Sequence, residues 1–405
     1  MQYPVGITRG IESKGALCTV HASGFPIRRN ALRLHSVTPI AVRLPLSKPI
    51  KMAGITLTHA ENLLVRIEDE TGRVGWGEAA SAPTMTGDLP SGLVAAVWYM
   101  KARLEGLEVD TLTEFSADLD GLMYGNHAAK SAIDIAVHDL MGHRLDLPVY
   151  ALLGGAKRRD MPVLWILATA GAQSDIAEAR AMADQGFSAF KIKVAAGPKA
   201  DRVRRDLDRS GAVRMAIGHG HRLSADANQG YALDEALAFA KGATTAGLDF
   251  IEQPVRFDDL AGMRAVSTAS GVPIGADEGL QCLADLERHH DHNAAQGGSF
   301  KILKFGGLQQ VLQAAQRADE LGMHVNLAGK VAETSIASAA LTHLGAALPQ
   351  IDWDISVTHQ YLTTDILAEP LPIRLGRVAP PDRPGLGITV DEDRVRRFAY
   401  DPGKS

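Results

Sequence analysis

Residues 249–279 read DFIEQPVRFDDLAGMRAVSTASGVPIGADEG, which is two short apolar runs on either side of a longer one. DFIEQPV and VPIGADEG are typical of buried strands, and the segment between them has the apolar spacing of a helix. Each strand-like run carries a carboxylate near its end, Glu252 in the first and Asp277 in the second. This order predicts a unit of strand, helix and strand in an α/β protein with a parallel sheet.

The same alternation continues through the chain beyond Met161, with strand-like runs such as AFKIKV, RLSADAN and SFKILKFGG. It predicts a parallel sheet that is closed as a barrel or wound open. Asp226, Glu252, Asp277 and Lys301 follow one another at intervals of 26, 25 and 24 residues. One β/α unit of a barrel takes roughly 25 to 30 residues, so these side chains are expected at one height on successive strands, at the mouth where barrels place their chemistry.

Three converging carboxylates repel one another unless a cation joins them. Hard oxygen ligands suit Mg²⁺, with Mn²⁺ as the other choice, better than zinc. The alternative is that each acid caps the helix after its strand, which is common for a single Asp or Glu. Three acids in register favour the metal site.

Two lysines alternate in the run FKIKV, so Lys191 and Lys193 point to the same side of their strand. They could face water on an edge strand, or one could be a general base whose pKa its neighbour lowers. In a barrel of eight strands they lie roughly opposite Lys301. That arrangement could remove a proton from one face of an α-carbon and return it to either face.

The part before the barrel has a different character. From Ala31 to about Gly77 the sequence predicts a small antiparallel sheet, and from about Gly92 to Leu153 helices. Residues 1–30 form an extension of unknown role.

Composition limits the class of protein. The chain has 405 residues, 46% hydrophobic and 22% charged, with a net charge of −5. No basic cluster or long apolar run predicts a nucleic-acid or membrane partner. Two distant cysteines, Cys18 and Cys282, form no disulfide framework, which fits a reducing cytoplasm.

The motifs FKIKV, SADANQGY, FIEQP, IGADEG, FKILKFGG and AETSIASAA, in this order, resemble the enolase superfamily and its muconate lactonising enzyme subgroup. The resemblance covers nearly all of residues 31–398. It implies a modified (β/α)7β TIM-type barrel with an α+β capping domain. The implied division is an extension over 1–30, a capping domain over 31–158, a barrel over 159–375 and a C-terminal segment over 376–405 that returns to the capping domain.

The resemblance also implies roles. Asp226, Glu252 and Asp277 become the Mg²⁺ ligands, Lys193 the base on one face with Lys191 beside it, and Lys301 the acid or base on the other. The family abstracts the proton α to a carboxylate, and the metal stabilises the resulting enediolate. Further residues are expected near the metal or the substrate: Asn228, Glu278 and Glu333.

The outcome of the reaction stays open between racemisation or epimerisation, dehydration and cycloisomerisation. Asp352 and Asp354 resemble the D-x-D with which dipeptide epimerases hold a substrate ammonium group, and the alternative is that they cap a helix or solvate a loop. The pair favours a racemase, epimerase or dehydratase of an amino-acid derivative of dipeptide, proline or betaine type. A muconate-type cycloisomerase is the alternative, and an inactive small-molecule binding protein the second.

Two loops of the capping domain, residues 46–59 and 80–88, are expected to close over a small carboxylate substrate, with Lys51 and Thr86 as contacts. The resemblance further implies a homo-oligomer, either an octamer or a dimer of dimers.

Overall fold

Strand and helix alternate through the second part of the chain as predicted. The computed structural model describes residues 32–52, 55–168 and 171–404, and within them eight parallel strands pair in chain order. The strands are β6 (Leu164–Leu167), β7 (Ala189–Lys193), β8 (Arg222–Asp226), β9 (Phe250–Glu252), β10 (Ile274–Ala276), β11 (Gly297–Phe300), β12 (His324–Ala328) and β13 (Ile355–Ser356). Val163, just before β6, bridges Ile355 in parallel, so β13 returns to β6 and closes the barrel.

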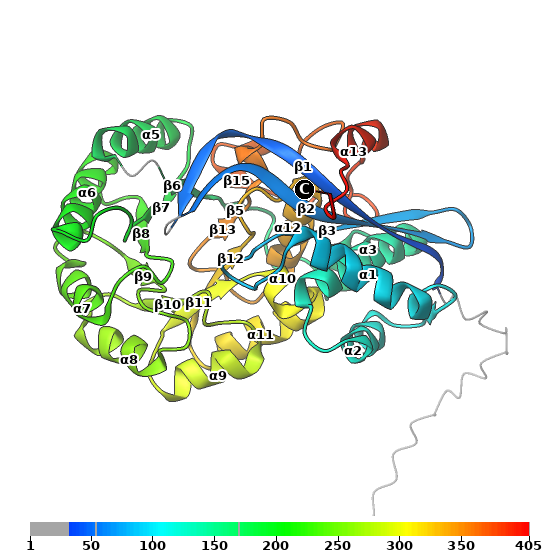
Figure 1. The fold of residues 1–405 in the computed structure, drawn as a ribbon, viewed down its shortest axis with the longest axis horizontal. Coiled ribbons are helices and arrows are strands. Elements are labelled where there is room, and N and C mark those ends of the chain that lie inside the picture. Colours follow the sequence, from blue (N-terminus) through cyan, green and yellow to red (C-terminus); the bar gives the residue numbers. More distant parts are fainter. Residues whose placement is uncertain (1–31, 53–54, 169–170, 405) are drawn as a thin grey trace, which may run out of the picture. The chain divides into compact units, whose positions relative to one another are not determined.

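Within the described ranges, a helix follows each of the first seven barrel strands and covers its outer side (Figure 1). These helices are α5 (Ala172–Asp184), α6 (Arg202–Ile217), α7 (Leu233–Gly242), α8 (Leu260–Ala269), α9 (Leu283–Asp291), α11 (Leu308–Glu320) and α12 (Ser335–Ala347). One extra turn, α10 (Ile302–Phe305), follows β11 directly. The predicted (β/α)7β barrel is confirmed.

The first part of the chain forms the predicted antiparallel sheet. Its strands are β1 (Leu32–Met52), β2 (Ile55–Asp69), β3 (Val74–Ala80) and β4 (Glu108–Val109), in the spatial order β3-β2-β1-β4. The helices α1 (Pro90–Leu104), α2 (Leu112–Leu122) and α3 (His127–Leu145) follow. A Cβ on Gly77 would lie 1.8 Å from the carbonyl oxygen of Ala132, so α3 packs directly against the backbone of β3.

The C-terminal residues return to this first sheet. After a small sheet of β5 (Met161–Pro162), β14 (Ile373–Arg374) and β15 (Arg377–Val378), helix α13 (Glu392–Phe398) leads to Ala399, which bridges Val42. The Tyr400 amide then donates to the carbonyl oxygen of Ala41 at 3.0 Å. The domain limits given above stay a prediction, and the extension over residues 1–30, with Cys18, lies outside the described residues.

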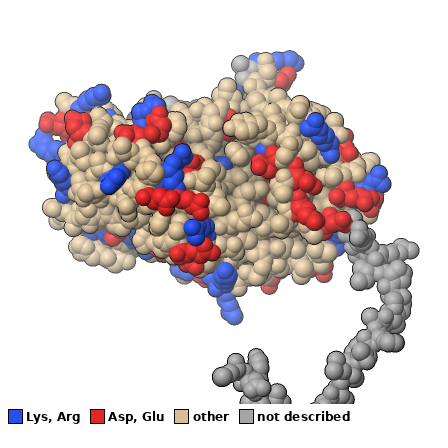
Figure 2. All heavy atoms as spheres, turned by 90° about the horizontal axis from the view of Figure 1, so that it is seen from below, with Lys and Arg blue, Asp and Glu red and all other residues tan. Residues whose placement is uncertain are grey.

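The surface carries charges of both signs. On the face shown in Figure 2, Lys and Arg side chains are scattered among Asp and Glu side chains. Among the residues described, no helix is long and apolar enough to cross a membrane.

Candidate active site

The three predicted carboxylates meet at the C-terminal mouth of the barrel. Asp226 and Glu252 are the last residues of β8 and β9 and lie in register, and Asp277 directly follows β10. One oxygen from each carboxylate lies within 4.8 Å of the others, and all three side chains are buried. Three buried oxygen donors this close fit a hard divalent cation such as Mg²⁺.

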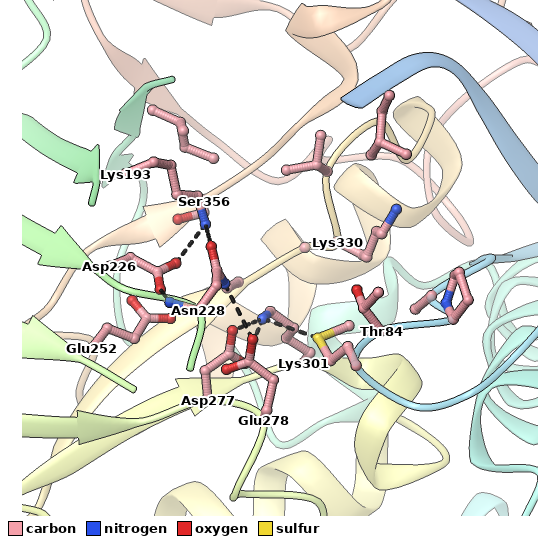
Figure 3. A pocket seen from close by; sticks show the side chains of 18 of the residues that line it. Thr84, Lys193, Asp226, Asn228, Glu252, Asp277, Glu278, Lys301, Lys330 and Ser356 are labelled. Carbon is pink, nitrogen blue, oxygen red and sulfur yellow. Dashed lines mark hydrogen bonds and ion pairs between the residues drawn. The ribbon is translucent and has the colours of Figure 1, made fainter. Parts of the chain in front are cut away.

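The predicted lysines reach the same place from two directions. Lys193, the last residue of β7, donates to Asp226 Oδ2 at 2.5 Å and to Asn228 Oδ1 at 2.9 Å. Lys301, the first residue after β11, donates to both oxygens of Asp277 at 2.5 Å. Figure 3 shows these amines among the carboxylates. Each lysine therefore lies next to a different member of the acidic triad.

The charges around these lysines act against their burial. Burial alone would lower the pKa of Lys193, but Asp226 and Glu252 outweigh it and the pKa is raised. The pKa of Lys301 is likewise raised, by Asp277 and Glu252 against its burial. A divalent cation held by the three carboxylates would offset the negative charge responsible for both shifts.

Lys191 lies on the expected side of β7 but contacts a carboxylate. Its ammonium donates to Glu252 and, at 3.2 Å, to Asn326 Oδ1, so it faces the carboxylate and not Lys193. The net pKa of Lys193 is raised, because Asp226 and Glu252 outweigh its burial. A lowering contribution from Lys191, as the sequence suggests, stays a prediction. Lys191 is positioned to hold Glu252 within the triad.

Asn228 and Glu278 lie beside the triad, as expected. The backbone N–H of Asn228 donates to Asp226 Oδ1 at 2.8 Å, and the side-chain nitrogen of Asn228 donates to Glu278 Oε1 at 3.2 Å. Burial, together with Asp277 and Asp226, raises the pKa of Glu278 to about 8. The neutral form of Glu278 is therefore favoured, and a cation held by the triad would oppose this shift.

A layer of polar side chains that the sequence analysis missed holds the triad in place. Ser299 donates to Glu252 Oε1 at 2.7 Å. The fully buried Lys304, from the short helix α10, donates to Asp277 Oδ1 at 2.7 Å and to the carbonyl oxygen of Ser299 at 2.8 Å. Lys304 is the second lysine of KILK, and a single helical turn brings it back to the side of Lys301. This spacing of three residues could have indicated its position.

Above the triad lies a cavity of about 300 Å³ between the barrel and the first sheet. The first sheet and the loop after it contribute the following residues to the cavity: Leu57, His59, Glu61, Ser81, Ala82, Pro83, Thr84 and Met85. Both segments expected over the substrate thus reach the cavity, but residues 46–52 and 55–59 of the first one belong to β1 and β2 and do not form a loop.

Thr86 and Lys51 were predicted to contact the substrate from these two segments. Thr86 does not line the cavity, because its hydroxyl donates to Asp88 Oδ2 at 2.6 Å within the turn, and Thr84 and Met85 face inward instead. The side chain of Lys51 lies outside the described residues.

Asp352 and Asp354 are not among the residues that line the cavity, so the structure does not support the prediction that they hold a substrate amine. Trp353 between them points into the barrel, where its ring stacks on Phe250 at 3.9 Å. The chain turns at Asp352 and Trp353, and Asp354 has a positive φ of 64°. Asp352 accepts from the Val325 amide at 3.0 Å, close to the start of β12. Asp354 pairs with Arg222, the first residue of β8, at 3.2 Å. They lie toward the end of the barrel opposite the triad.

Glu333 lies behind the cavity and not in its wall. Its Oε2 packs over Gly329, where a Cβ would come within 2.6 Å. Burial and the nearby Glu78 raise the pKa of Glu333 to about 8. Ser356, at the end of β13, and Lys330 line the cavity in this region, and the sequence analysis named neither.

Residues 35–154 match the N-terminal domain of mandelate racemase and muconate lactonizing enzymes, and residues 175–394 match the enolase C-terminal domain-like family. The chain belongs to the enolase superfamily. Muconate cycloisomerase 1 of Pseudomonas putida is 33% identical over 87% of this chain and 94% of its own. The N-succinyl-L-Arg/Lys racemase of Bacillus cereus is 29% identical over 91% of this chain and 99% of its own.

Solved structures of the superfamily agree. The muconate lactonizing enzyme of Pseudomonas fluorescens, crystallised with muconolactone, is 32% identical and superposes with a TM-score of 0.87 over 91% of this chain and 100% of that one. This chain is an enzyme of the superfamily, in the group of cycloisomerases, racemases and epimerases. Members bind a divalent metal ion, and this chain presents an acidic triad for it.

Proposed function

We propose that this enzyme transfers a proton at the carbon next to a substrate carboxylate, and that it racemises or epimerises an amino-acid derivative. The observation that carries the proposal is the position of Lys193 and Lys301. Three strands separate β7 from β11 whichever way round the barrel they are counted in the described chain. Two amines on opposite sides of the triad suit a reaction in which one face of a carbon loses a proton and the other gains one.

The triad of Asp226, Glu252 and Asp277 is proposed to hold Mg²⁺, with Mn²⁺ as a substitute. Such an ion supplies electrostatic stabilisation for the negative charge that develops on the substrate carboxylate. Lys191 and Ser299 hold Glu252, and Lys304 holds Asp277, so the ligand oxygens are fixed before substrate binds. Preorganisation of this kind avoids the cost of reorganising the site during the reaction.

The two lysines then exchange roles with the direction of the reaction. With one enantiomer, the neutral amine of Lys193 accepts the α-proton and the substrate becomes an enediolate. The Lys301 ammonium donates a proton to the opposite face of the same carbon. The reverse direction starts from Lys301 as base, so the site needs one lysine neutral and the other charged at the start of each turnover.

An acylated amine fits the cavity better than a free one. A substrate ammonium group needs a charged carboxylate, and the described residues that line the cavity include two outside the triad. Glu61 is paired with Arg43 at 2.7 Å, and burial together with Asp277 and Asp226 raises the pKa of Glu278, which favours its neutral form. Substrates whose reacting residue has an acylated nitrogen, such as N-acyl amino acids and the C-terminal residue of a dipeptide, are therefore favoured over free amines, proline compounds and betaines. The similarity to an N-succinyl amino-acid racemase supports this choice. Dehydration of a β-substituted derivative would use the same first step.

A muconate-type cycloisomerase is the second candidate. The relatives include muconate and chloromuconate cycloisomerases, and the similar crystal structure contains muconolactone. The two candidates differ in the compound whose α-proton exchanges.

Exchange of the α-proton, followed by NMR in D₂O with Mg²⁺, tests the proposal on N-succinyl amino acids, dipeptides, proline derivatives and muconolactone. Deuterium in an N-acyl amino acid, with loss of optical rotation, is the expected result. Exchange restricted to muconolactone would assign the cycloisomerase, and no exchange in any compound would refute proton transfer as the function.

We further propose a homo-oligomeric assembly and a cytoplasmic location. Trp98 and Tyr99 on α1 are 51% and 57% exposed, which supports association into a homo-oligomer, an octamer or a dimer of dimers. Light scattering of the purified protein tests this. A cytoplasmic location is proposed from the free Cys282 and the small-molecule chemistry of the relatives.

A further inference from the structure

Lys330 brings a further cation to the cavity, in addition to the lysines that contact the triad. It lies two residues after β12 and lines the cavity together with Gly329, Val331 and, from the first sheet, Glu61. In the view of Figure 3 its amine lies on the far side of the cavity from Asp226 and Glu252. It is thus placed to meet a part of the substrate other than the group bound at the triad.

The ammonium of Lys330 has no partner among the residues that the structure describes. Lys191, Lys193 and Lys301 each form an ion pair with a triad carboxylate, whereas neither a hydrogen bond nor an ion pair joins the Lys330 amine to a described residue. Neither of the two acids near Lys330 is available as a charged partner. Glu333 is mostly protonated because burial raises its pKa to about 8, and Glu61 is held by Arg43.

The backbone that carries Lys330 is held firmly. Its carbonyl oxygen accepts from Thr358 Oγ1 at 2.7 Å and from the Glu333 amide at 3.2 Å. The preceding Gly329 amide donates to the Ser356 carbonyl oxygen at 2.8 Å. These contacts tie the segment to the end of β13, so the lysine is presented to the cavity from a fixed point.

We propose that Lys330 binds a second anionic group of the substrate, a carboxylate distant from the one held at the triad, and thereby selects dicarboxylates over monocarboxylates. The inference rests on the proposed function, since it assumes that the reacting carboxylate lies at the triad. A distal carboxylate of the substrate would form the ion pair with the Lys330 ammonium that no described residue forms. An N-succinyl or a glutamyl group carries such a carboxylate. Burial lowers the pKa of Lys330 to about 8, and a bound carboxylate would favour its charged form.

Two probes that cannot react separate binding from turnover. N-Succinyl-2-aminoisobutyrate and its succinamoyl counterpart have the same shape, lack an α-proton and differ only in a distal carboxylate or amide. Their dissociation constants are measured by calorimetry with Mg²⁺ for the wild-type protein and for Lys330→Met, Lys330→Arg and the control Lys241→Met, which changes an exposed lysine on α7. Circular dichroism confirms that each variant is folded.

The wild-type protein and Lys241→Met should bind the succinyl probe about 10- to 100-fold more tightly than the amide, as expected for one charge-assisted hydrogen bond. Lys330→Met should bind both probes equally, and Lys330→Arg should keep most of the preference. Equal binding of both probes by the wild-type protein, binding of neither, or a preference that survives in Lys330→Met would overturn the proposal.

Failure of this inference can be distinguished from failure of the proposed function. Exchange at the α-carbon of N-succinyl-L-norleucine and its succinamoyl counterpart is followed in parallel. A preference in binding without exchange in either compound would refute the reaction and keep the subsite. Exchange at equal kcat/KM in both compounds, with equal probe binding, would refute the subsite and keep the reaction.

Discussion

Asp352 and Asp354 should contribute to stability and not to catalysis, although their pattern resembles a substrate-binding motif. The test is the double substitution Asp352→Asn and Asp354→Asn, which keeps both shapes and removes both charges. Asp354 loses an ion pair with Arg222 at 3.2 Å, and Asp352 loses the charge it presents to the Val325 amide at 3.0 Å. Each loss of a charge-assisted contact costs about 1 kcal/mol.

Two features reduce this cost. An asparagine oxygen can still accept from the Val325 amide, and burial already raises the pKa of Asp354 to about 6, so its charged form is partly disfavoured. The free energy of unfolding, measured by urea titration, should therefore fall by about 1–2 kcal/mol in total. Because both residues lie toward the end of the barrel opposite the triad, kcat/KM for α-proton exchange should change less than about threefold, which corresponds to roughly 0.6 kcal/mol.

The control is Asp226→Asn, a substitution of the same kind inside the triad, which should lower kcat/KM by at least about 100-fold. A folded double variant that lost activity to a similar degree would show that the aspartates reach the substrate. The placement of Trp353 inside the barrel would then be wrong as well.

Other predictions concern pH, metal and packing. Burial raises the pKa of Glu78 to about 7 from 4.5. Between these two pH values the folded state therefore binds more protons than the unfolded chain, and the free energy of unfolding falls by roughly 3 kcal/mol as the pH rises through this range. Urea titrations of Glu78→Gln should lack that slope, and curves parallel to wild type would contradict the assignment. Mg²⁺ at 100 times its dissociation constant should stabilise the wild-type protein by about 2.7 kcal/mol, EDTA should reverse this in a thermal melt, and an unchanged response in Asp277→Asn would count against the triad. Gly77→Ala should cost about 1–3 kcal/mol in a urea titration, because its Cβ would meet the Ala132 carbonyl oxygen at 1.8 Å, and wild-type stability would contradict the close packing of α3.

The barrel and its acidic triad could be predicted because both depend on spacing along the chain. Asp226, Glu252 and Asp277 recur at the interval of one β/α unit, and parallel pairing in chain order turns that interval into proximity. Lys193 and Lys301 followed from the same rule. Alternation along FKIKV correctly placed Lys191 and Lys193 on one side of β7.

What the sequence could not supply was the direction of side chains outside this regular pattern. Lys191 was expected to act on Lys193, but the partner of a buried lysine is the nearest carboxylate across the barrel, here Glu252. The positions of Asp352 and Asp354 also depend on distant parts of the chain, since Asp354 pairs with Arg222 and the ring of Trp353 stacks on Phe250.

The sequence does contain a signal for Lys330. It comes 29 residues after Lys301, close to one further β/α unit, and just after the run HVNLA that forms β12. Its lack of a partner, in contrast, depends on three-dimensional positions of Glu61 and Glu333, from distant parts of the chain. The contacts of Thr84 and Met85 likewise depend on how the loop after β3 lies over the barrel.

The central claim is that Lys193 and Lys301 act on opposite faces of one α-carbon. The most direct measurement is α-proton exchange in D₂O with each enantiomer of the substrate separately, for the wild-type protein, Lys193→Met and Lys301→Met. The wild-type protein should exchange and interconvert both enantiomers. Each variant should lose interconversion by at least about 100-fold and keep exchange with one enantiomer, and the two variants should keep opposite ones. Retention of the same enantiomer by both variants, or racemisation at the wild-type rate by either, would contradict the account.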